Sequence, residues 1–128
     1  MDTAPIQSID HVVLTVRDPE ASAQFYARVL GMAVERFGAG RLALRFGSQK
    51  INLHPLGMET RNHACIGSGD LCLITTWDLG RMAARLAAEG VTVIEGPVAR
   101  TGATGPITSI YFNDPDGNLI EISRYGQD

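Results

Sequence analysis

The chain has 128 residues, of which 45% are hydrophobic and 20% are charged, as is usual for one soluble globular domain. Its net charge of −3 and its lack of a basic stripe exclude nucleic acid as the main partner, because phosphate binding needs clustered lysine and arginine. No apolar run approaches the roughly 20 residues that span a bilayer, and the first residues lack the features of a signal peptide. We therefore expect a cytoplasmic protein without a membrane partner.

The first part of the chain is predicted to form a strand, a helix and three more strands. After a strand at 10–16, the stretch 17–31 reads as a helix, with Asp18 as its N-cap and Pro19 at its first position. Gly31 follows the last apolar turn, where a glycine can take positive φ. The three strands that follow are expected at 32–37, 41–46 and 49–54.

The same pattern returns after a linker at 55–68. At an offset of 59 residues His11 falls over Asp70 and Gly31 over Gly90, so 76–90 is predicted to be the second helix. Its three following strands are expected at 91–95, 106–113 and 118–124, with a loop rich in glycine, proline and threonine at 96–106 and a hairpin turn at 116–117. The last strands also correspond, with Asn52 over Glu121 at an offset of 69.

The predicted fold is α+β, with residues 1–128 as one domain built from two βαβββ modules at 9–54 and 69–124. One helix covers only one face of a four-stranded sheet. Two such sheets would leave their other faces open and join into a curved trough, which is a natural place for a ligand.

Glu121 and His11 are the most conspicuous polar residues of the predicted strands. Glu121 lies between Ile120 and Ile122, and a carboxylate that faces a cavity needs a partner such as a divalent cation. His11 lies in an apolar strand, where a lone histidine is more often a satisfied core residue than a ligand. Cys72, also in an apolar strand, is expected to be a small core residue.

The opening DHVVLTVRDPEASAQFYARVLGM and the ending SIYFNDPDGNLIEI resemble the vicinal oxygen chelate superfamily, which includes glyoxalase I, extradiol dioxygenases and bleomycin-binding proteins. The resemblance covers residues 9–124. It implies a glyoxalase-like fold in which the first and last strands of each module supply the ligands of a divalent metal. His11 and Glu121 match the family pattern, whereas Asp70 stands where many members have histidine and Asn52 where several have glutamate or glutamine.

The sequence leaves the fourth ligand open between His54, the weak neutral oxygen donor Asn52, and water alone. His54 shares a strand face with Asn52 two residues away, about 6.5–7 Å along the strand. It could bind the metal if the strand bulges, and otherwise it would serve as an acid–base or substrate-contact group. A site of His11, Asp70, Glu121 and His54 would take a divalent ion such as Fe, Mn, Ni, Zn or Mg.

The resemblance implies a metal-dependent enzyme whose substrate chelates the metal through neighbouring oxygens, with lyase, isomerase or ring-cleavage chemistry. Glu121 or His54 would act as the base, and Tyr111 as a hydrogen-bond donor to the substrate. Arg100 could pair with an anionic substrate group. The alternative is a metal-free protein that sequesters a drug or another ligand, as bleomycin-binding members do. A homodimer is expected from the resemblance alone.

Overall fold

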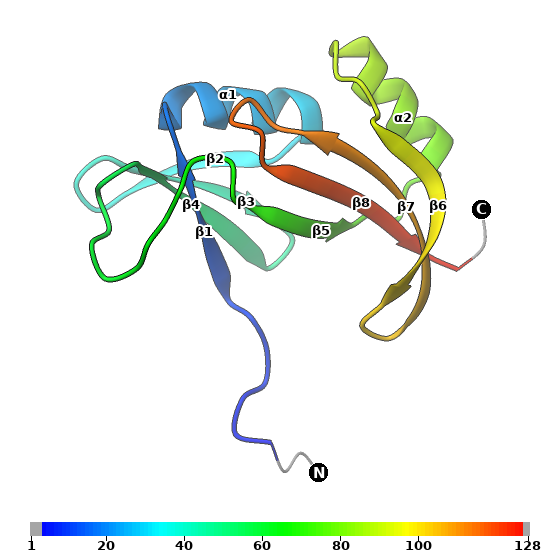
Figure 1. Cartoon of the computed structure of the whole chain (residues 1–128), viewed down its shortest axis with the longest axis horizontal. Coiled ribbons are helices and arrows are strands. Elements are labelled where there is room, and N and C mark those ends of the chain that lie inside the picture. Colours follow the sequence, from blue (N-terminus) through cyan, green and yellow to red (C-terminus); the bar gives the residue numbers. More distant parts are fainter. Residues whose placement is uncertain (1–3, 127–128) are drawn as a thin grey trace.

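The structure, a computed structural model, describes residues 4–126, which form two four-stranded sheets and two helices (Figure 1). The elements of the first half are β1 (His11–Val16), α1 (Pro19–Leu30), β2 (Ala33–Phe37), β3 (Arg41–Phe46) and β4 (Gln49–Pro55). Those of the second half are β5 (Asp70–Ile74), α2 (Leu79–Ala88), β6 (Glu95–Gly102), β7 (Gly105–Asn113) and β8 (Leu119–Tyr125). The strand orders are β1-β4-β3-β2 and β5-β8-β7-β6, so the predicted α+β fold and its internal repeat are confirmed.

The strand register reproduces the predicted correspondence between the halves. β1 pairs with β4 in parallel, with Val13 opposite Asn52, and β5 pairs with β8 in parallel, with Cys72 opposite Glu121. Val13 and Cys72 are the residues that correspond at the first offset, and Asn52 and Glu121 correspond at the second. The two sheets therefore place equivalent residues at equivalent points.

Helix α1 begins and ends where the sequence predicts. The Asp18 side chain accepts hydrogen bonds from the backbone N–H groups of Glu20 and Ala21 at 3.0 and 3.2 Å, which satisfies donors that the first turn leaves without partners. Gly31 ends the helix with a φ of 69°, a left-handed conformation that favours glycine. In the second half, Asp78 caps α2 in the same way, and Gly90 follows its end with a φ of 77°.

The strand predicted at 91–95 and the loop predicted at 96–106 are wrong. β6 instead begins at Glu95 and runs through the glycine- and proline-containing stretch to Gly102, where it turns directly into β7. β6 is an edge strand, and its register shifts between Glu95 and Val98, where Pro97 lies. Edge strands tolerate proline and glycine at such irregularities, because no second neighbour needs their N–H groups.

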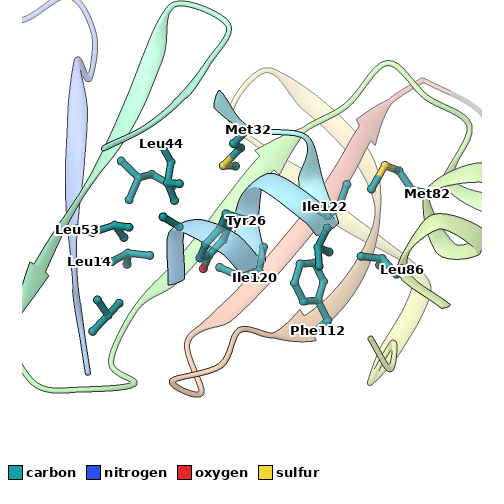
Figure 2. Close-up of a cluster of buried hydrophobic side chains, with 14 of the residues drawn as sticks. Leu14, Tyr26, Met32, Leu44, Leu53, Met82, Leu86, Phe112, Ile120 and Ile122 are labelled. Carbon is teal, nitrogen blue, oxygen red and sulfur yellow. The ribbon is translucent and has the colours of Figure 1, made fainter. Parts of the chain in front are cut away.

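One hydrophobic core joins the two halves, and α1 lies at its centre. Figure 2 shows Tyr26 between Leu14 and Leu53 of the first sheet and Ile120 of the second. The ring of Phe25 lies 6.3 Å from that of Phe112 on β7. Through these contacts the two halves share one set of packed side chains.

The acid-rich turn between β7 and β8 anchors α1 to the second half. The Tyr26 hydroxyl donates to Asp114 Oδ2 at 2.6 Å, and Ser22 donates to Asp116 at 3.3 Å. Asp116 also accepts from the Arg17 backbone N–H at 3.0 Å, and both carboxylates are buried. The predicted turn at 116–117 is confirmed, with Gly117 at a φ of 87°, and it also clamps the two halves together.

Candidate functional site

Each sheet has a core face and an opposite face, which we call the open face. Strand alternation places Leu14 of β1 in the core and leaves His11 on the open face. The same alternation puts Asn52 and His54 of β4, Asp70 and Cys72 of β5, and Glu121 and Ser123 of β8 on the open faces. Every candidate ligand predicted from the sequence thus lies on an open face.

Glu121 is held in place by two serines on its own sheet. Ser109 donates to Glu121 Oε2 at 2.6 Å, and Ser123 approaches the same oxygen at 3.2 Å. The two serine hydroxyls lie 2.7 Å apart, and both residues are completely buried. A carboxylate that accepts hydrogen bonds from buried hydroxyls is fixed in orientation.

Tyr111 lies opposite Glu121 across the β7–β8 ladder, and its hydroxyl accepts a hydrogen bond from Arg100. Arg100 Nε donates to the Tyr111 hydroxyl at 3.0 Å, and a second guanidinium nitrogen pairs with Glu95 at 3.0 Å. Burial raises the pKa of Tyr111, the hydrogen bond from Arg100 opposes that rise, and Glu121 reinforces it. Tyr111 is therefore a neutral hydroxyl beside the Glu121 carboxyl group, which suits a hydrogen-bond donor.

His11 lies at the seam between the two sheets. It lines a hollow of about 140 Å³ together with Lys50 and Cys72, which we call the seam hollow. His11 Nδ1 lies 2.9 Å from Asp10 Oδ1, and this hydrogen bond lowers the pKa of Asp10. Nδ1 is thus the donating nitrogen, and Nε2 remains available as an acceptor or a metal ligand.

The prediction that Cys72 is a core residue is wrong. Its side chain is exposed, because β5 alternation sends Leu71 and Leu73 into the core and Cys72 to the open face. Cys72 lines both the seam hollow and a second hollow of about 290 Å³ that contains Glu121, which we call the carboxylate hollow. The Cys72 sulfur lies 3.1 Å from the Ser123 hydroxyl, and partial shielding of the sulfur from solvent raises the pKa of the thiol.

His54 and Asn52 are buried on the open face of the first sheet, with exposed fractions of 7% and 9%. His54 Nδ1 and Asn52 Oδ1 are enclosed without a hydrogen-bond partner. His54 lines a third and larger hollow, of about 360 Å³, which we call the linker chamber because residues 59–69 form most of its wall. Asp70, at the start of β5, is exposed and lies opposite Leu119.

The four candidate ligands are not gathered within one chain. Across residues 4–126, no three histidine, cysteine, aspartate or glutamate side chains lie close enough to hold a metal ion. His11 lines the seam hollow, Glu121 the carboxylate hollow and His54 the linker chamber. The donor chemistry of His11 and Glu121 suits a divalent ion, but the arrangement in a single chain does not fit one.

Sequence reasoning missed the serines beneath Glu121 as its hydrogen-bond donors. The sequence contained the signal, because Ser109 and Tyr111 share one face of β7, and Glu121 and Ser123 share one face of β8. It also missed the enclosure of His54, which depends on the path of the linker.

Among the described residues no helix is long and apolar enough to cross a membrane.

The chain matches known proteins over nearly its whole length. It is 50% identical to the glyoxalase domain-containing protein RDO1 of Mycosarcoma maydis, over 94% of this chain and 69% of that protein. It is 52% identical to the integron cassette protein VCH_CASS1 from the mobile metagenome of V. cholerae, over 98% of this chain and all of that one, with a TM-score of 0.91.

Two more distant structures share the fold alone. They are a lactoylglutathione lyase from Agrobacterium tumefaciens (22% identity, TM-score 0.75, 97% and 100% of the two chains) and TnmS3, an antibiotic-binding protein from Streptomyces sp. CB03234 (24%, 0.74, 94% and 98%). The Glyoxalase/Bleomycin resistance protein/Dioxygenase superfamily matches residues 8–122. The repeated fold, the sequence identity and this match together show that the chain belongs to that superfamily.

Proposed function

We propose that the protein is a metal-dependent enzyme of the glyoxalase or dioxygenase type, which acts on a small molecule that chelates a divalent metal through neighbouring oxygens. The observation that carries the proposal is the Glu121 carboxylate, which Ser109 and Ser123 hold on the open face of the second sheet. A fixed carboxylate beside a hollow of about 290 Å³ is equipped to bind a metal ion or to accept a proton. The reaction would be of the lyase, isomerase or ring-cleavage kind.

The chain's own residues supply the parts that proton-transfer chemistry needs. Glu121, when it is released from the metal, would take a proton from a substrate carbon next to a carbonyl. The Tyr111 hydroxyl would donate to an oxygen of the substrate, and Arg100, 3.0 Å from that hydroxyl, would favour negative charge there. His54, in a separate hollow, is better suited to contact a bound molecule than to join the ligand set.

We propose His11, Asp70 and Glu121 as the metal ligands, with Fe, Mn, Ni, Zn or Mg as the ion. Because one chain does not gather them, the site would be completed by a second copy in a homodimer. In a dimer with twofold symmetry, His11 of one copy would meet Glu121 of the other at two equivalent sites. The exposed Val13 and Ile74, on the first strands of the two halves, are apolar residues that such a contact would cover.

The test measures how much metal is bound by the wild type, by two single-ligand variants, and by the two variants produced together. Protein purified without chelator is loaded separately with Mn, Fe, Ni, Zn and Mg, and bound metal is measured by elemental analysis beside the molecular mass in solution. His11→Ala and Glu121→Ala should each abolish occupancy. If the two variants are co-expressed, half of the dimers are mixed and each mixed dimer has one intact site, so about a quarter of wild-type occupancy should return.

No recovery in the mixed dimers would place both ligands in the same chain and refute the shared site. No metal in the wild type, with any of the five ions, would refute metal dependence itself. If metal binds, catechol cleavage and hemithioacetal isomerisation assays separate ring-cleavage from glyoxalase chemistry. Treatment with a chelator should remove either activity.

The second candidate is a metal-free protein that sequesters a small ligand. The observation that favours it is that residues 4–126 of one chain gather no three metal ligands, although they surround three hollows. On this reading the wild type would bind no metal under any loading condition, and it would show no turnover in either assay.

A further inference from the structure

The linker chamber is a cavity that the proposed metal site does not use. It is bounded by the carboxyl-end halves of β1 and β4 on one side and by the linker on the other, and its volume is about 360 Å³. Cavities of this size hold small organic molecules. Thr15 and His54, which face each other across the parallel β1–β4 ladder, both line it.

His54 is the feature that points to a ligand. The residue is 7% exposed, and of its two ring nitrogens only Nδ1 is enclosed without a partner. A buried N–H donor without an acceptor is rarer in proteins than a buried acceptor without a donor. The proton therefore belongs on Nε2, the ring nitrogen that is not enclosed, which makes His54 a hydrogen-bond donor for a molecule in the chamber.

The end of the linker packs closely against the β7–β8 turn, because two glycines allow the approach. A Cβ at Gly67 would meet the Asp116 backbone oxygen at 2.8 Å, and one at Gly69 would meet Asn118 Oδ1 at 2.7 Å. The Gly69 N–H also donates to that Asn118 oxygen at 2.7 Å. The chamber is therefore a built feature of the fold, with walls from the first sheet, the linker and the second half.

Four polar side chains that line the chamber can donate hydrogen bonds and have no partner within the described chain. Within residues 4–126, the side chains of Thr15, His54, Asn62 and His63 line the chamber and make no hydrogen bond or ion pair. The one carboxylate in the wall, Glu59, is paired with Arg61 at 2.7 and 2.8 Å, and these contacts lower its pKa to about 2. Its negative charge is thus already balanced.

Two ligand classes can be compared on this wall. A metal ion does not fit, because no three of the ligating side chains in the described part of the chain lie close enough together. A carboxylate fits, because each of its oxygens accepts hydrogen bonds and the imidazole, amide and hydroxyl groups can donate them. We propose that the linker chamber binds a small carboxylic acid anion, whose carboxylate accepts hydrogen bonds from His54 and Thr15.

The experiment uses the fact that the chain has three histidines. Ring signals of His11, His54 and His63 are followed by nuclear magnetic resonance in the full chain, with a chelator present so that no metal contributes. Butyrate is the probe, and butyramide, which has the same shape without the charge, is the matched control. Thr15→Val removes one donor at nearly constant size, and His11→Gln is the control variant on the seam hollow.

Butyrate should shift the His54 signals saturably and leave the His11 signals unmoved. Butyramide should bind at least about tenfold more weakly, because hydrogen bonds to a charged acceptor are roughly twice as strong as those to a neutral one. Thr15→Val should weaken butyrate binding by about five- to tenfold, and His11→Gln should leave it unchanged. Equal binding of the two probes, shifts without saturation, or shifts centred on His11 would overturn the proposal. Since the chelator removes any metal, each of these outcomes is independent of the proposed enzyme activity.

Discussion

The hydrogen bond between Tyr26 and Asp114 should contribute measurably to the stability of the whole chain. Tyr26→Phe removes a fully buried hydroxyl that donates to a buried carboxylate at 2.6 Å. Hydrogen bonds to charged groups contribute about 1.5–3 kcal/mol. Asp114 would keep its bonds from the backbone N–H groups of Asp116 and Asn118 and from the Asn118 amide, so we expect about 2 kcal/mol, near the lower part of that range.

The free energy of unfolding would be measured by urea denaturation, and for a chain of this size 2 kcal/mol lowers the midpoint of thermal unfolding by about 6 °C. Tyr125→Phe is the matched control, because its hydroxyl only accepts a surface hydrogen bond from the Thr104 N–H at 3.2 Å. If Tyr26→Phe is no more destabilising than Tyr125→Phe, the acid-rich turn does not clamp α1 as described.

Three further predictions concern pH, the core and the linker. Burial, followed by the charge of nearby Asp114, raises the pKa of Tyr26. The contribution of the Tyr26 hydroxyl to the free energy of unfolding is therefore complete below pH 10 and is lost as pH rises above that value. Above pH 10, wild-type stability should fall more steeply than that of Tyr26→Phe, by up to about 1.4 kcal/mol per pH unit. Leu86→Ala, at a fully buried position, should cost about 2–5 kcal/mol in urea denaturation, whereas Leu56→Ala, at a 61% exposed one, should be close to neutral. Gly69→Ala should cost about 1–3 kcal/mol by the same measurement, because its Cβ meets Leu14 at 2.7 Å; a variant as stable as the wild type would show that the linker is not held there.

Most of the fold could be predicted because its signals are local. Asp18 and Gly31 mark the ends of α1 by capping chemistry that depends on neighbouring residues only. The internal repeat extended these predictions to the second half. There Cys72 pairs with Glu121 just as Val13 pairs with Asn52 in the first half. Most of β6 was predicted to be a loop, because proline and glycine indicate a loop unless the strand is known to lie at a sheet edge.

The candidate site could be predicted less well, because it depends on contacts between distant parts of the chain. Strand alternation was enough to place Glu121 on the open face. It could not show that Ser109 and Ser123 donate to one of its oxygens, since that requires the pairing of β7 with β8. The burial of His54 depends on where the linker runs, and no local pattern encodes that path.

The turn at 113–118 has a consequence for altering this protein. It fixes the point at which β8 starts, and Glu121 follows only three residues after Asn118, whose side chain is tied to Asp114. A substitution that loosens the anchor of α1 would therefore also shift the carboxylate on which the proposed chemistry depends. Stability and reactivity share one short segment, so laboratory evolution should find few changes there that improve one without disturbing the other.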